Sequence, residues 1–536
     1  MQAAISSDRN VAFTGVSRLL VPSFSDCLFV ALLLWVFAAG SGWSVLLADG
    51  DTGWHIRTGD YILATRSVPT QDLFSFSKPG APWYAWEWLA EVVFAVFHRV
   101  AGLKGVSVLA GVVLSLSATL LFRHMMWRGA HILLALGVTF LAAGASTVHY
   151  LARPHIFTFV GLTVSLWILD RDRQKPDAAV WWLVPLTALW VNMHGGFLAW
   201  LASLALVTAG CALKAALEPK GSPARSAPVG RYAVLLGACS LATLLNPYGF
   251  RLHQHMVNYL SSVWIRQVVE EFQSPRFRSE SMLQFEILLL AGIAMTPLLL
   301  RKGHWPETLL LWFWAHSALV SARHVPIYAI VAAPICVREA SLLWRNWSTR
   351  FERRSLAGAF RDCFEDLSRS PRRTSIWLGV AVVLLAAMPW DGPQDFPANK
   401  FPLAALKHDA GVIAPVGRSA PRILTSDQWA DYLIYRFYPR ARVFVDGRSD
   451  FYGPEVGRQY LELMNGGHNW EDIVKRYRFE LALIPFEWPL AQLMMRHPDW
   501  QVRYLDHQAV LLEHRGGTGL NQKPDSTERI HRGIRP

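Results

Sequence analysis

The sequence is short of charged residues. Asp, Glu, Lys and Arg make up 17% of its 536 residues, whereas a soluble domain has about a quarter. Hydrophobic residues account for 52%, and 24 residues are tryptophan. This balance excludes an ordinary soluble protein and predicts a chain that crosses a membrane several times. The net charge of +12 does not indicate nucleic-acid binding, because the basic residues are gathered in loops between apolar runs.

Cysteine is also scarce. The chain has five cysteines and none after Cys363, and no two of them have CxxC spacing. A disulfide framework is therefore excluded for the C-terminal region, and no cysteine pair offers a metal site. The sequence also lacks a P-loop, GxSxG, HExxH, and a GxGxxG between a strand and a helix. These absences count against an ATPase, a hydrolase and a dehydrogenase.

What the sequence has instead is a series of eleven apolar runs, which we expect to be membrane-spanning helices. They lie at residues 27–47, 105–122, 130–148, 156–169, 179–191, 196–213, 232–245, 283–300, 307–320, 325–337 and 375–390. The first run is too long for the apolar part of a signal peptide, so we expect it to be retained. Several runs are shorter than a full membrane crossing, so their polar ends should reach membrane depth around a protein-lined cavity.

The distribution of Lys and Arg predicts the orientation. If residues 1–26 are cytoplasmic, every cytoplasmic loop is basic, as the positive-inside rule requires. These loops contain Arg123, Arg128, Arg171, Arg173, Lys175, the segment 214–231, Arg301, Lys302 and the segment 338–373. The same assignment gathers polar, turn-rich helix ends on the outer face: residues 149–155, 192–196, 246–249 and 321–326. Residues 27–390 then form a transmembrane domain, with the first outer loop at 48–104.

That first outer loop carries the strongest candidates for chemistry. Asp49 and Asp51 stand where the first helix leaves the bilayer, and Asp51 lies four residues before His55. Partial removal from water raises the proton affinity of a carboxylate, which suits a catalytic base acting on a hydroxyl. The same acids are also consistent with a solvated helix end. Residues 87–100 have the apolar spacing of an amphipathic helix lying at the membrane interface.

Other outer-face residues have the chemistry to bind a polar substrate. The candidates are His55, Arg153, His155, Asn192, His194, Arg323 and His324. Arg153 and Arg323 could each bind a phosphate at headgroup level, because the guanidinium donates two parallel hydrogen bonds. Pairing of these arginines with an acid such as Asp51 or Glu87 is an equal alternative. Asn192 and His194 lie in a segment that is first of all a turn. Asp51 and His55 are candidate ligands of a divalent metal ion, but their sequence spacing gives only a weak signal.

From about residue 391 the sequence alternates short strands with helices, which predicts an α/β domain over 391–515. The expected strands are 423–424, 442–446, 481–485, 501–505 and 509–513, and the expected helices are 427–438, 454–465, 470–476 and 490–496. Asp446, Arg448 and Asp450 follow a strand, where binding loops occur, but a salt bridge within a folded domain explains them as well. We expect residues 516–536 to be a disordered tail.

These features together resemble the GT-C superfamily of glycosyltransferases, which use lipid-phosphate sugars. The resemblance rests on Asp49 and Asp51 at the exit of the first helix, the downstream Pro69 and Asp72, and Gly80, Pro82 and Trp83. The segments WxNxHGG and NPYG also resemble a group of bacterial multispanning proteins labelled as candidate glycosyltransferases or left uncharacterised. The chain departs from relatives in having Asp-Gly-Asp followed by Trp-His in place of an adjacent acidic pair.

The resemblance implies an inverting glycosyltransferase of the bacterial inner membrane. It would move a sugar from a polyprenyl-phosphate donor to an acceptor glycan, lipid or protein on the extracytoplasmic face, without a nucleotide cofactor. Asp51 would be the base or would help to hold a metal ion, and the α/β domain would be periplasmic. Two alternatives remain open: a transporter or flippase of a lipid-linked saccharide, and a non-enzymatic assembly component of envelope polysaccharide synthesis.

Overall fold

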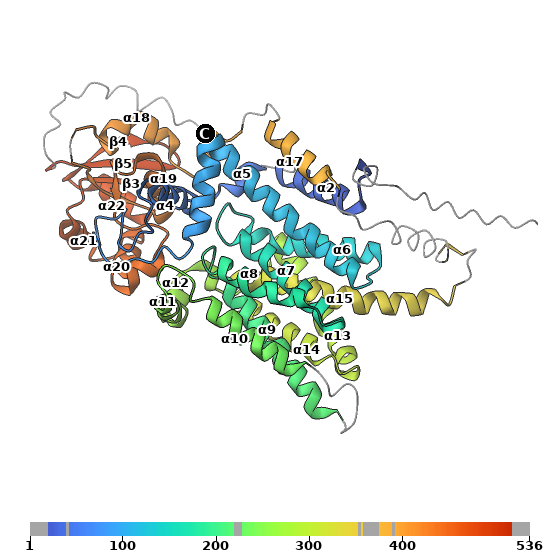
Figure 1. Ribbon diagram of the computed structural model, residues 1–536. Helices are drawn as coiled ribbons and strands as arrows, with labels where there is room; N and C mark the ends of the chain where they lie inside the picture. Colours follow the sequence, from blue (N-terminus) through green and yellow to red (C-terminus); the bar gives the residue numbers. More distant parts are fainter. Residues whose placement is uncertain are drawn as a thin grey trace, which may run out of the picture. The chain divides into compact units, whose positions relative to one another are not determined.

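The computed structural model describes residues 20–38, 42–218, 228–351, 355, 356, 358, 375–387, 392–417 and 419–516. The chain forms two compact units (Figure 1). The helical unit comprises residues 1–73, 80–401 and 447–453, and the α/β unit comprises 74–79, 402–446 and 454–536. Most of the predicted N-terminal segment 1–26 and nearly all of the predicted tail 516–536 lie outside the described residues.

Each apolar run contains helix, but the run predicted as one helix at 27–47 contains two, Phe24–Ala38 and the short Trp43–Leu46, because Gly42 is not helical. The helices of this unit are α2 (Phe24–Ala38), α3 (Trp43–Leu46), α4 (Asp51–Thr65), α5 (Trp88–Trp127), α6 (Ile132–Ser146), α7 (Ile156–Gln174), α8 (Leu183–Trp190), α9 (Phe197–Leu217), α10 (Val229–Ala242), α11 (Phe250–Ser261), α12 (Val263–Val268), α13 (Glu280–Arg301), α14 (Trp305–Val320), α15 (Val325–Ser348) and α17 (Trp377–Ala387). Five stretches are long and apolar enough to cross a membrane: Trp88–Trp127, Ile132–His149, Phe197–Leu217, Ser281–Arg301 and Ala322–Ser348. Four shorter apolar helical stretches accompany them in the described residues. The polytopic helical fold predicted from the sequence is confirmed.

The first outer loop contains a helix that the sequence analysis did not predict. Residues after Asp49 turn directly into α4, and Asp51 is the first residue of that helix. Gly59 allows this helix to pack closely against its neighbour. A Cβ on Gly59 would lie 2.0 Å from the Glu91 carbonyl oxygen, so only glycine lets α4 lie against the start of α5. The predicted outer loop 48–104 therefore contains helix over Asp51–Thr65.

Helix α5 changes direction at the point where the sequence analysis ended its predicted amphipathic helix. Ala101 and Gly102 leave helical geometry, and Gly102 has φ 60° and ψ −152°. That conformation suits glycine, because it lacks a Cβ. The helix predicted at 87–100 is therefore present as the first part of α5, and its place at the membrane interface stays a prediction.

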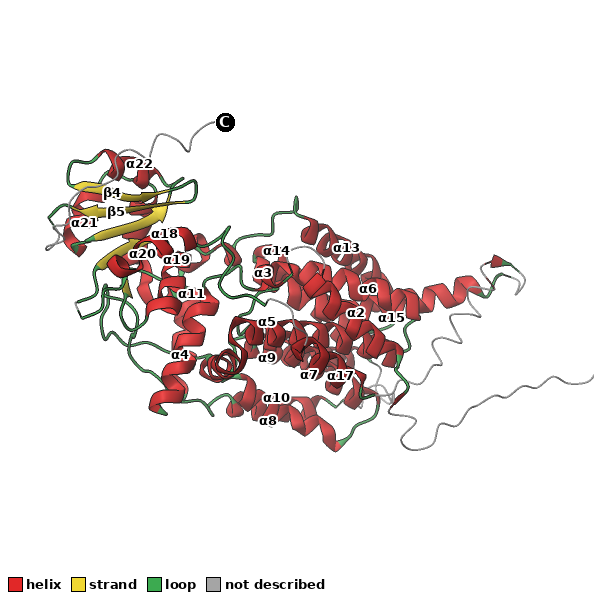
Figure 2. Ribbon diagram, turned by 90° about the horizontal axis from the view of Figure 1, so that it is seen from above, coloured by secondary structure: helices red, strands yellow, loops and turns green. Residues whose placement is uncertain are grey.

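The α/β unit has one five-stranded sheet, shown in yellow in Figure 2. The strands are β1 (Arg422–Thr425), β2 (Arg442–Val443), β3 (Leu481–Pro485), β4 (Trp500–Leu505) and β5 (Ala509–His514). Their order is β2-β1-β3-β5-β4, with β1 parallel to β2 and β3. The other two ladders are antiparallel, as expected for the predicted C-terminal hairpin.

Helices connect and cover these strands: α18 (Leu403–Ile413), α19 (Asp427–Phe437), α20 (Ser449–Met464), α21 (Trp470–Tyr477) and α22 (Pro489–Arg496). Ser426 caps α19, because its hydroxyl accepts a hydrogen bond from the Trp429 N–H at 3.2 Å. Helix α18 was not predicted, and β2 is shorter than the expected strand 442–446. Part of the first outer loop also belongs to this unit, since the backbone of Phe74 and Phe76 hydrogen-bonds with Val443.

A second group of buried charges lies at the opposite ends of the helices from the candidate site. We call it the far-end network, and its members are His124, Arg128, Asp170, Arg173 and Glu307. Asp170 lies 2.9 Å from both His124 and Arg128, and Glu307 lies 3.0 Å from Arg173. Two of the arginines predicted to lie in cytoplasmic loops, Arg128 and Arg173, are therefore paired with acids. They neutralise buried acids.

Candidate functional site

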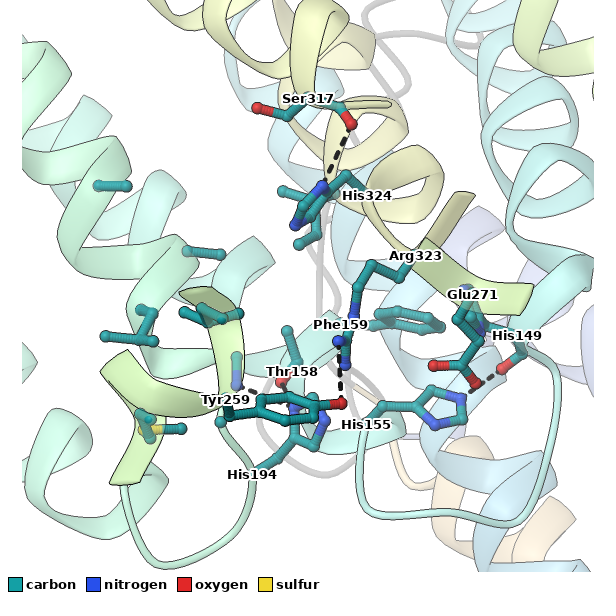
Figure 3. Close-up of a pocket in the computed structure, with 18 of the residues that line it drawn as sticks. His149, His155, Thr158, Phe159, His194, Tyr259, Glu271, Ser317, Arg323 and His324 are labelled. Atoms are coloured by element: carbon teal, nitrogen blue, oxygen red, sulfur yellow. Dashed lines mark hydrogen bonds between the residues drawn. The ribbon is translucent and has the colours of Figure 1, made fainter. Parts of the chain in front are cut away.

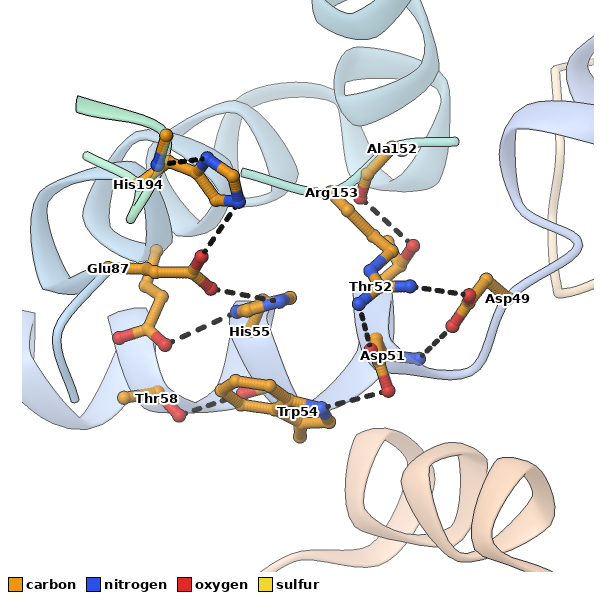
Figure 4. Close-up of polar contacts among 12 residues, drawn as sticks. Asp49, Asp51, Thr52, Trp54, His55, Thr58, Glu87, Ala152, Arg153 and His194 are labelled. Atoms are coloured by element: carbon orange, nitrogen blue, oxygen red, sulfur yellow. Dashed lines mark hydrogen bonds and ion pairs between the residues drawn. The ribbon is translucent and has the colours of Figure 1, made fainter. Parts of the chain in front are cut away.

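Three acids converge on one arginine at the polar end of the helical unit. The Arg153 guanidinium lies 2.7 Å from Asp51 and 3.0 Å from Asp49 (Figure 4). It also lies 2.9 Å from Glu271. We call these four residues the acid–arginine cluster. The alternative in which Arg153 pairs with Asp51 is therefore what the structure shows.

Local backbone contacts hold this cluster in place. The Asp51 N–H donates to the Asp49 carboxylate at 2.9 Å, which satisfies a free N–H at the start of α4. The Thr52 hydroxyl donates to the Ala152 carbonyl at 3.0 Å. Arg153 therefore lies next to the N-terminus of α4, where carboxylates are also favoured by the helix dipole.

Burial and charge oppose each other in the cluster. Burial acts to lower the pKa of Arg153, but Asp51, Asp49 and Glu271 outweigh it and raise that pKa well above its usual value. Burial alone would raise the pKa of Glu271, and the nearby Arg153 instead lowers it. Arg153 and Glu271 are therefore charged at neutral pH and hold each other in place.

A cavity of about 300 Å³ opens beside this cluster. Its polar wall contains His149, His155, Thr158, His194, Tyr259, Glu271, Arg323 and His324 (Figure 3). Glu87 and Arg153 belong to the same wall. Its apolar wall contains Leu198, Ala199 and Ala202 of α9, Met256 and Leu260 of α11, Phe313 and Trp314 of α14, and Ile327 of α15. The cavity thus joins a charged end to an apolar flank, a combination that suits an amphipathic ligand.

Arg323 differs from Arg153 in its surroundings. Its guanidinium lies over the Phe272 ring, 4.3 Å from the centroid, and 3.4 Å from the Tyr259 hydroxyl. Among the described residues, no carboxylate lies within ion-pair distance of it. Arg323 is therefore a cation in the cavity wall with donors left for an anion, whereas Arg153 is already engaged by three acids.

Four histidines also line the cavity. The His155 Nε2 lies 2.6 Å from the His149 carbonyl oxygen, and the His324 Nδ1 lies 3.2 Å from the Ser317 carbonyl oxygen. In the described part of the chain, the buried Nε2 of His149 has no hydrogen-bond partner. Burial lowers the pKa of His194 to about 3 and that of His155 well below its usual value, and nearby cationic groups add to both shifts. His155 and His194 are therefore neutral and act through directed hydrogen bonds.

Glu87 lies between two imidazoles. One of its oxygens is 3.7 Å from the His55 Nε2, and the other is 3.5 Å from the His194 Nε2 (Figure 4). The His55 Nδ1 lies 3.2 Å from Glu91. Burial raises the pKa of Glu87 to about 8, with Arg153 partly opposing the shift. Burial also lowers the pKa of His55 well below its usual value.

The predicted catalytic and substrate-binding residues thus fall into two groups. Arg153, His155, His194, Arg323 and His324 line the cavity, whereas Asp49, Asp51, His55 and Asn192 stand outside its lining. Asn192 donates to the carbonyls of Ala188 and Leu245 and accepts from the Trp88 indole. It therefore has the turn-stabilising role that was the first interpretation of its segment.

Asp51 and His55 do not fit a divalent metal ion as their side chains lie. One Asp51 oxygen accepts from the Trp54 indole and the other faces Arg153. Both His55 nitrogens face glutamates. Within the described residues, no group of three or more His, Cys, Asp or Glu side chains is arranged around a metal position.

The loop after β2 is held by ion pairs within the helical unit. Arg448 lies 2.7 Å from Asp72, and both side chains are buried. Asp450 lies 3.1 Å from His255. The salt-bridge interpretation of this loop therefore accounts for Arg448, with a partner in the first outer loop that the sequence did not indicate.

Sequence reasoning missed several cavity residues, chiefly Glu87, Tyr259 and Glu271. Glu87 was assigned to the amphipathic helix. Glu271 belongs to the adjacent pair Glu270-Glu271, which stands in a segment where we predicted no elements. An adjacent acidic pair in an outer loop is a signal that could have marked Glu271.

Comparison with solved structures defines the fold. An oligosaccharyltransferase of Archaeoglobus fulgidus in the apo form superposes with a TM-score of 0.52 at 12% identity, over 86% of this chain and 69% of that one. The archaeal oligosaccharyltransferase AglB from the same organism, in complex with an inhibitory peptide and a dolichol-phosphate, superposes with a TM-score of 0.54 at 11% identity, over 93% and 74%. The chain has the GT-C glycosyltransferase fold.

ArnT from Cupriavidus metallidurans bound to undecaprenyl phosphate is a further neighbour, with a TM-score of 0.48 at 14% identity, over 91% of this chain and 97% of that one. No protein-family model and no curated protein matches the sequence. The GT-C neighbours are polytopic membrane proteins with a C-terminal domain, and this chain has the same arrangement of a helical unit followed by a C-terminal α/β unit.

Proposed function

We propose that this protein is a membrane glycosyltransferase that moves a sugar from a polyprenyl-phosphate-linked donor to an acceptor glycan, lipid or protein. The observation that carries the proposal is the cavity, where the Arg323 guanidinium faces the same space as the apolar side chains of α9 and α14. A lipid phosphate has this combination of an anion and an apolar chain. The oligosaccharyltransferase AglB, which has the same fold, was determined with a dolichol-phosphate.

In this proposal Arg323 holds the donor phosphate, with His324 and His155 as neutral hydrogen-bonding neighbours. Arg323 has donors left for phosphate oxygens, and guanidinium–phosphate pairs are charge-assisted and directional. The isoprenyl chain lies along the apolar wall. The acceptor hydroxyl attacks the anomeric carbon from the side opposite the phosphate, so the sugar is transferred with inversion.

The acid–arginine cluster has a positioning role in this proposal. Asp49, Asp51 and Glu271 fix Arg153 at the edge of the cavity and neutralise its charge, so the positive charge that stabilises the leaving phosphate comes from Arg323. The mechanism depends on no metal ion. The prediction that Asp51 is the catalytic base stays a prediction. One oxygen of Asp51 lies against Arg153 and the other accepts a hydrogen bond from the Trp54 indole.

We also propose the topology inferred from the loop charges. The N-terminus lies in the cytoplasm of a bacterium, the cavity opens at the extracytoplasmic face of the inner membrane, and the α/β unit is periplasmic. An accessibility assay on single cysteines introduced at Lys175 and Arg496 tests this arrangement. Labelling of position 496 but not 175 from the periplasm is expected, and the reverse result contradicts it.

The far-end network disfavours the transporter alternative. The cavity beside it has a volume of about 20 Å³, which holds about one water molecule. Its charges are paired with each other, so this end of the bundle is closed by ion pairs. A flippase would need a polar path past this point, whereas a transferase needs only the open cavity at the other end.

Transfer and donor binding by the purified protein test the proposal. Transfer is measured as release of polyprenyl phosphate from a panel of radiolabelled polyprenyl-phosphate hexoses and pentoses, and binding is measured with undecaprenyl phosphate in detergent. We expect Arg323→Ala to weaken binding about tenfold or more, since a charge-assisted hydrogen bond contributes about 1.5–3 kcal/mol. Arg276→Ala is the matched control, because that exposed arginine pairs with the exposed Glu270 and lines no part of the cavity. Absence of both transfer and lipid binding in the wild type contradicts the proposal.

A further inference from the structure

Two of the acids around the site line the cavity, Glu87 and Glu271. They differ in what they contact. Glu271 lies 2.9 Å from the Arg153 guanidinium, which lowers its affinity for a proton. Glu87 has no guanidinium within ion-pair distance among the described residues, and its two oxygens face the imidazoles of His55 and His194.

The other candidate base, Asp51, is held more tightly. Its two oxygens are engaged by Arg153 at 2.7 Å and by the Trp54 indole at 3.3 Å, and it does not line the cavity. A base must reach the proton that it removes. Glu87 meets that condition in the structure, because its side chain forms part of the cavity wall.

We propose that the Glu87 carboxylate accepts the proton of the acceptor hydroxyl during sugar transfer. This inference rests on the proposed function. The acceptor oxygen forms a bond to the anomeric carbon, and the bond between that carbon and the phosphate oxygen breaks. Its electron pair leaves with the phosphate, which Arg323 neutralises, and the acceptor proton moves to Glu87.

The two histidines are arranged to hold Glu87 in position and to pass its proton on. The Gly196 N–H donates to the His194 Nδ1 at 2.9 Å, so a neutral His194 carries its proton on Nε2, which faces Glu87. His55 lies between Glu87 and Glu91 and, when neutral, has only one N–H for two carboxyl groups. One of those two carboxyl groups must therefore be protonated to donate a hydrogen bond to the other His55 nitrogen. A proton can then move along Glu87, His55 and Glu91.

The charge around Glu87 suits a base that works near neutral pH. The charged and titratable groups that face it are His55, His194, Arg153, Arg323, Asp51, Asp450 and, on its own helix, Glu91. Burial, the largest influence, raises the pKa of Glu87 to about 8. About a tenth of the Glu87 side chains are then ionised at pH 7, and the ionised form is a stronger base than an exposed carboxylate.

Glu87→Gln tests the assignment because it keeps the shape of the side chain and removes the base. We expect the transfer rate to fall at least a hundredfold, while undecaprenyl phosphate binds within about twofold of the wild type. Glu270→Gln is the control, since it makes the same change at an exposed site. Glu87→Asp, which keeps a carboxylate, should retain an intermediate rate and establishes that a change at this position allows folding.

The pH dependence distinguishes a base from a structural residue. The wild-type transfer rate should rise almost tenfold from pH 6 to pH 7, rise more slowly after that, and level off above about pH 8. The small residual transfer rate of Glu87→Gln should not follow this curve. Asp51→Asn should keep the wild-type pH curve even if its rate is lower. Transfer by Glu87→Gln within threefold of the wild type overturns the assignment while leaving the proposed function in place. A wild type that neither binds nor uses a lipid-linked donor overturns both.

Discussion

The Arg153 guanidinium lies 2.7 Å from a carboxylate oxygen of Asp51, and the same guanidinium also contacts Asp49 and Glu271. Arg153 comes from the turn before α7, and Asp51 is the first residue of α4. One ion-pair cluster therefore ties the first outer loop to the helical bundle. Because this cluster borders the cavity, its integrity determines the shape of the site.

Removing Arg153 should destabilise the protein. Arg153→Ala leaves three acids facing one another without their cation, and breaking a buried ion pair costs about 3–5 kcal/mol. We expect a lower thermal midpoint in detergent, whereas Arg276→Ala should change the stability by less than about 0.5 kcal/mol because its ion pair is exposed. Equal midpoints for the two variants would show that the cluster does not stabilise the fold.

Gly59 should tolerate no larger side chain. A Cβ at this position would lie 2.0 Å from the Glu91 carbonyl oxygen and 2.7 Å from the Ala95 side chain. Gly59→Ala should therefore push α4 away from α5, with a loss of about 1–3 kcal/mol or more. Gly137→Ala is the matched control, because nothing lies within 4 Å of a Cβ at that helical site and alanine favours helix. Measurement of both thermal midpoints checks the prediction, and a stabilising Gly59→Ala would contradict it.

The raised pKa of Glu87 should make the protein less stable as the pH rises. A carboxyl whose pKa is about 8 in the folded state and near 4.5 when unfolded keeps its proton longer in the folded state. Stability is then lost between these two values, by at most about 1.4 kcal/mol per pH unit for one proton. From pH 7 to 8, where unfolded histidines are mostly neutral, the thermal midpoint of the wild type should fall more steeply than that of Glu87→Gln. Identical slopes would contradict a raised Glu87 pKa.

The far-end network should matter for stability and not for chemistry. Asp170→Asn removes the carboxylate that faces His124 and Arg128 at 2.9 Å, so the two arginines of the network keep one acid between them. We expect a lower thermal midpoint with a nearly unchanged transfer rate per folded molecule. Glu471→Gln, in an exposed pair with Lys475, is the control for loss of a surface acid. A transfer defect without loss of stability would give this end of the bundle a role in function.

Much of the fold follows from local patterns in the sequence. The apolar runs contain helices because a span must satisfy its backbone hydrogen bonds internally. The alternation from about residue 391 predicts strands that overlap β1 to β5. Helix α4 could not be predicted in this way, since Gly59, which weakens a helix in isolation, is explained only by the close approach of α5. The second strand was predicted at 442–446, but only Arg442–Val443 forms β2, and the local pattern did not indicate its pairing with residues 74–76.

The candidate site was predicted in part. Orientation by loop charge gathered the outer helix ends, and the structure brings Arg153, His155, His194, Arg323 and His324 to one cavity. The sequence could not separate Arg153, which is saturated by acids, from Arg323, which is not. It also could not find Glu87, because the cavity-facing position of that acid depends on how the start of α5 lies against the turn at His194.

A structure of the protein with undecaprenyl phosphate tests the central claim most directly. We predict that the phosphate lies within hydrogen-bond distance of the Arg323 guanidinium and that the isoprenyl chain contacts α9 and α14. The Glu87 side chain should remain between His55 and His194, open to the space beside the phosphate. A lipid phosphate bound away from Arg323, or a cavity that stays empty when the lipid is bound elsewhere, would contradict this account.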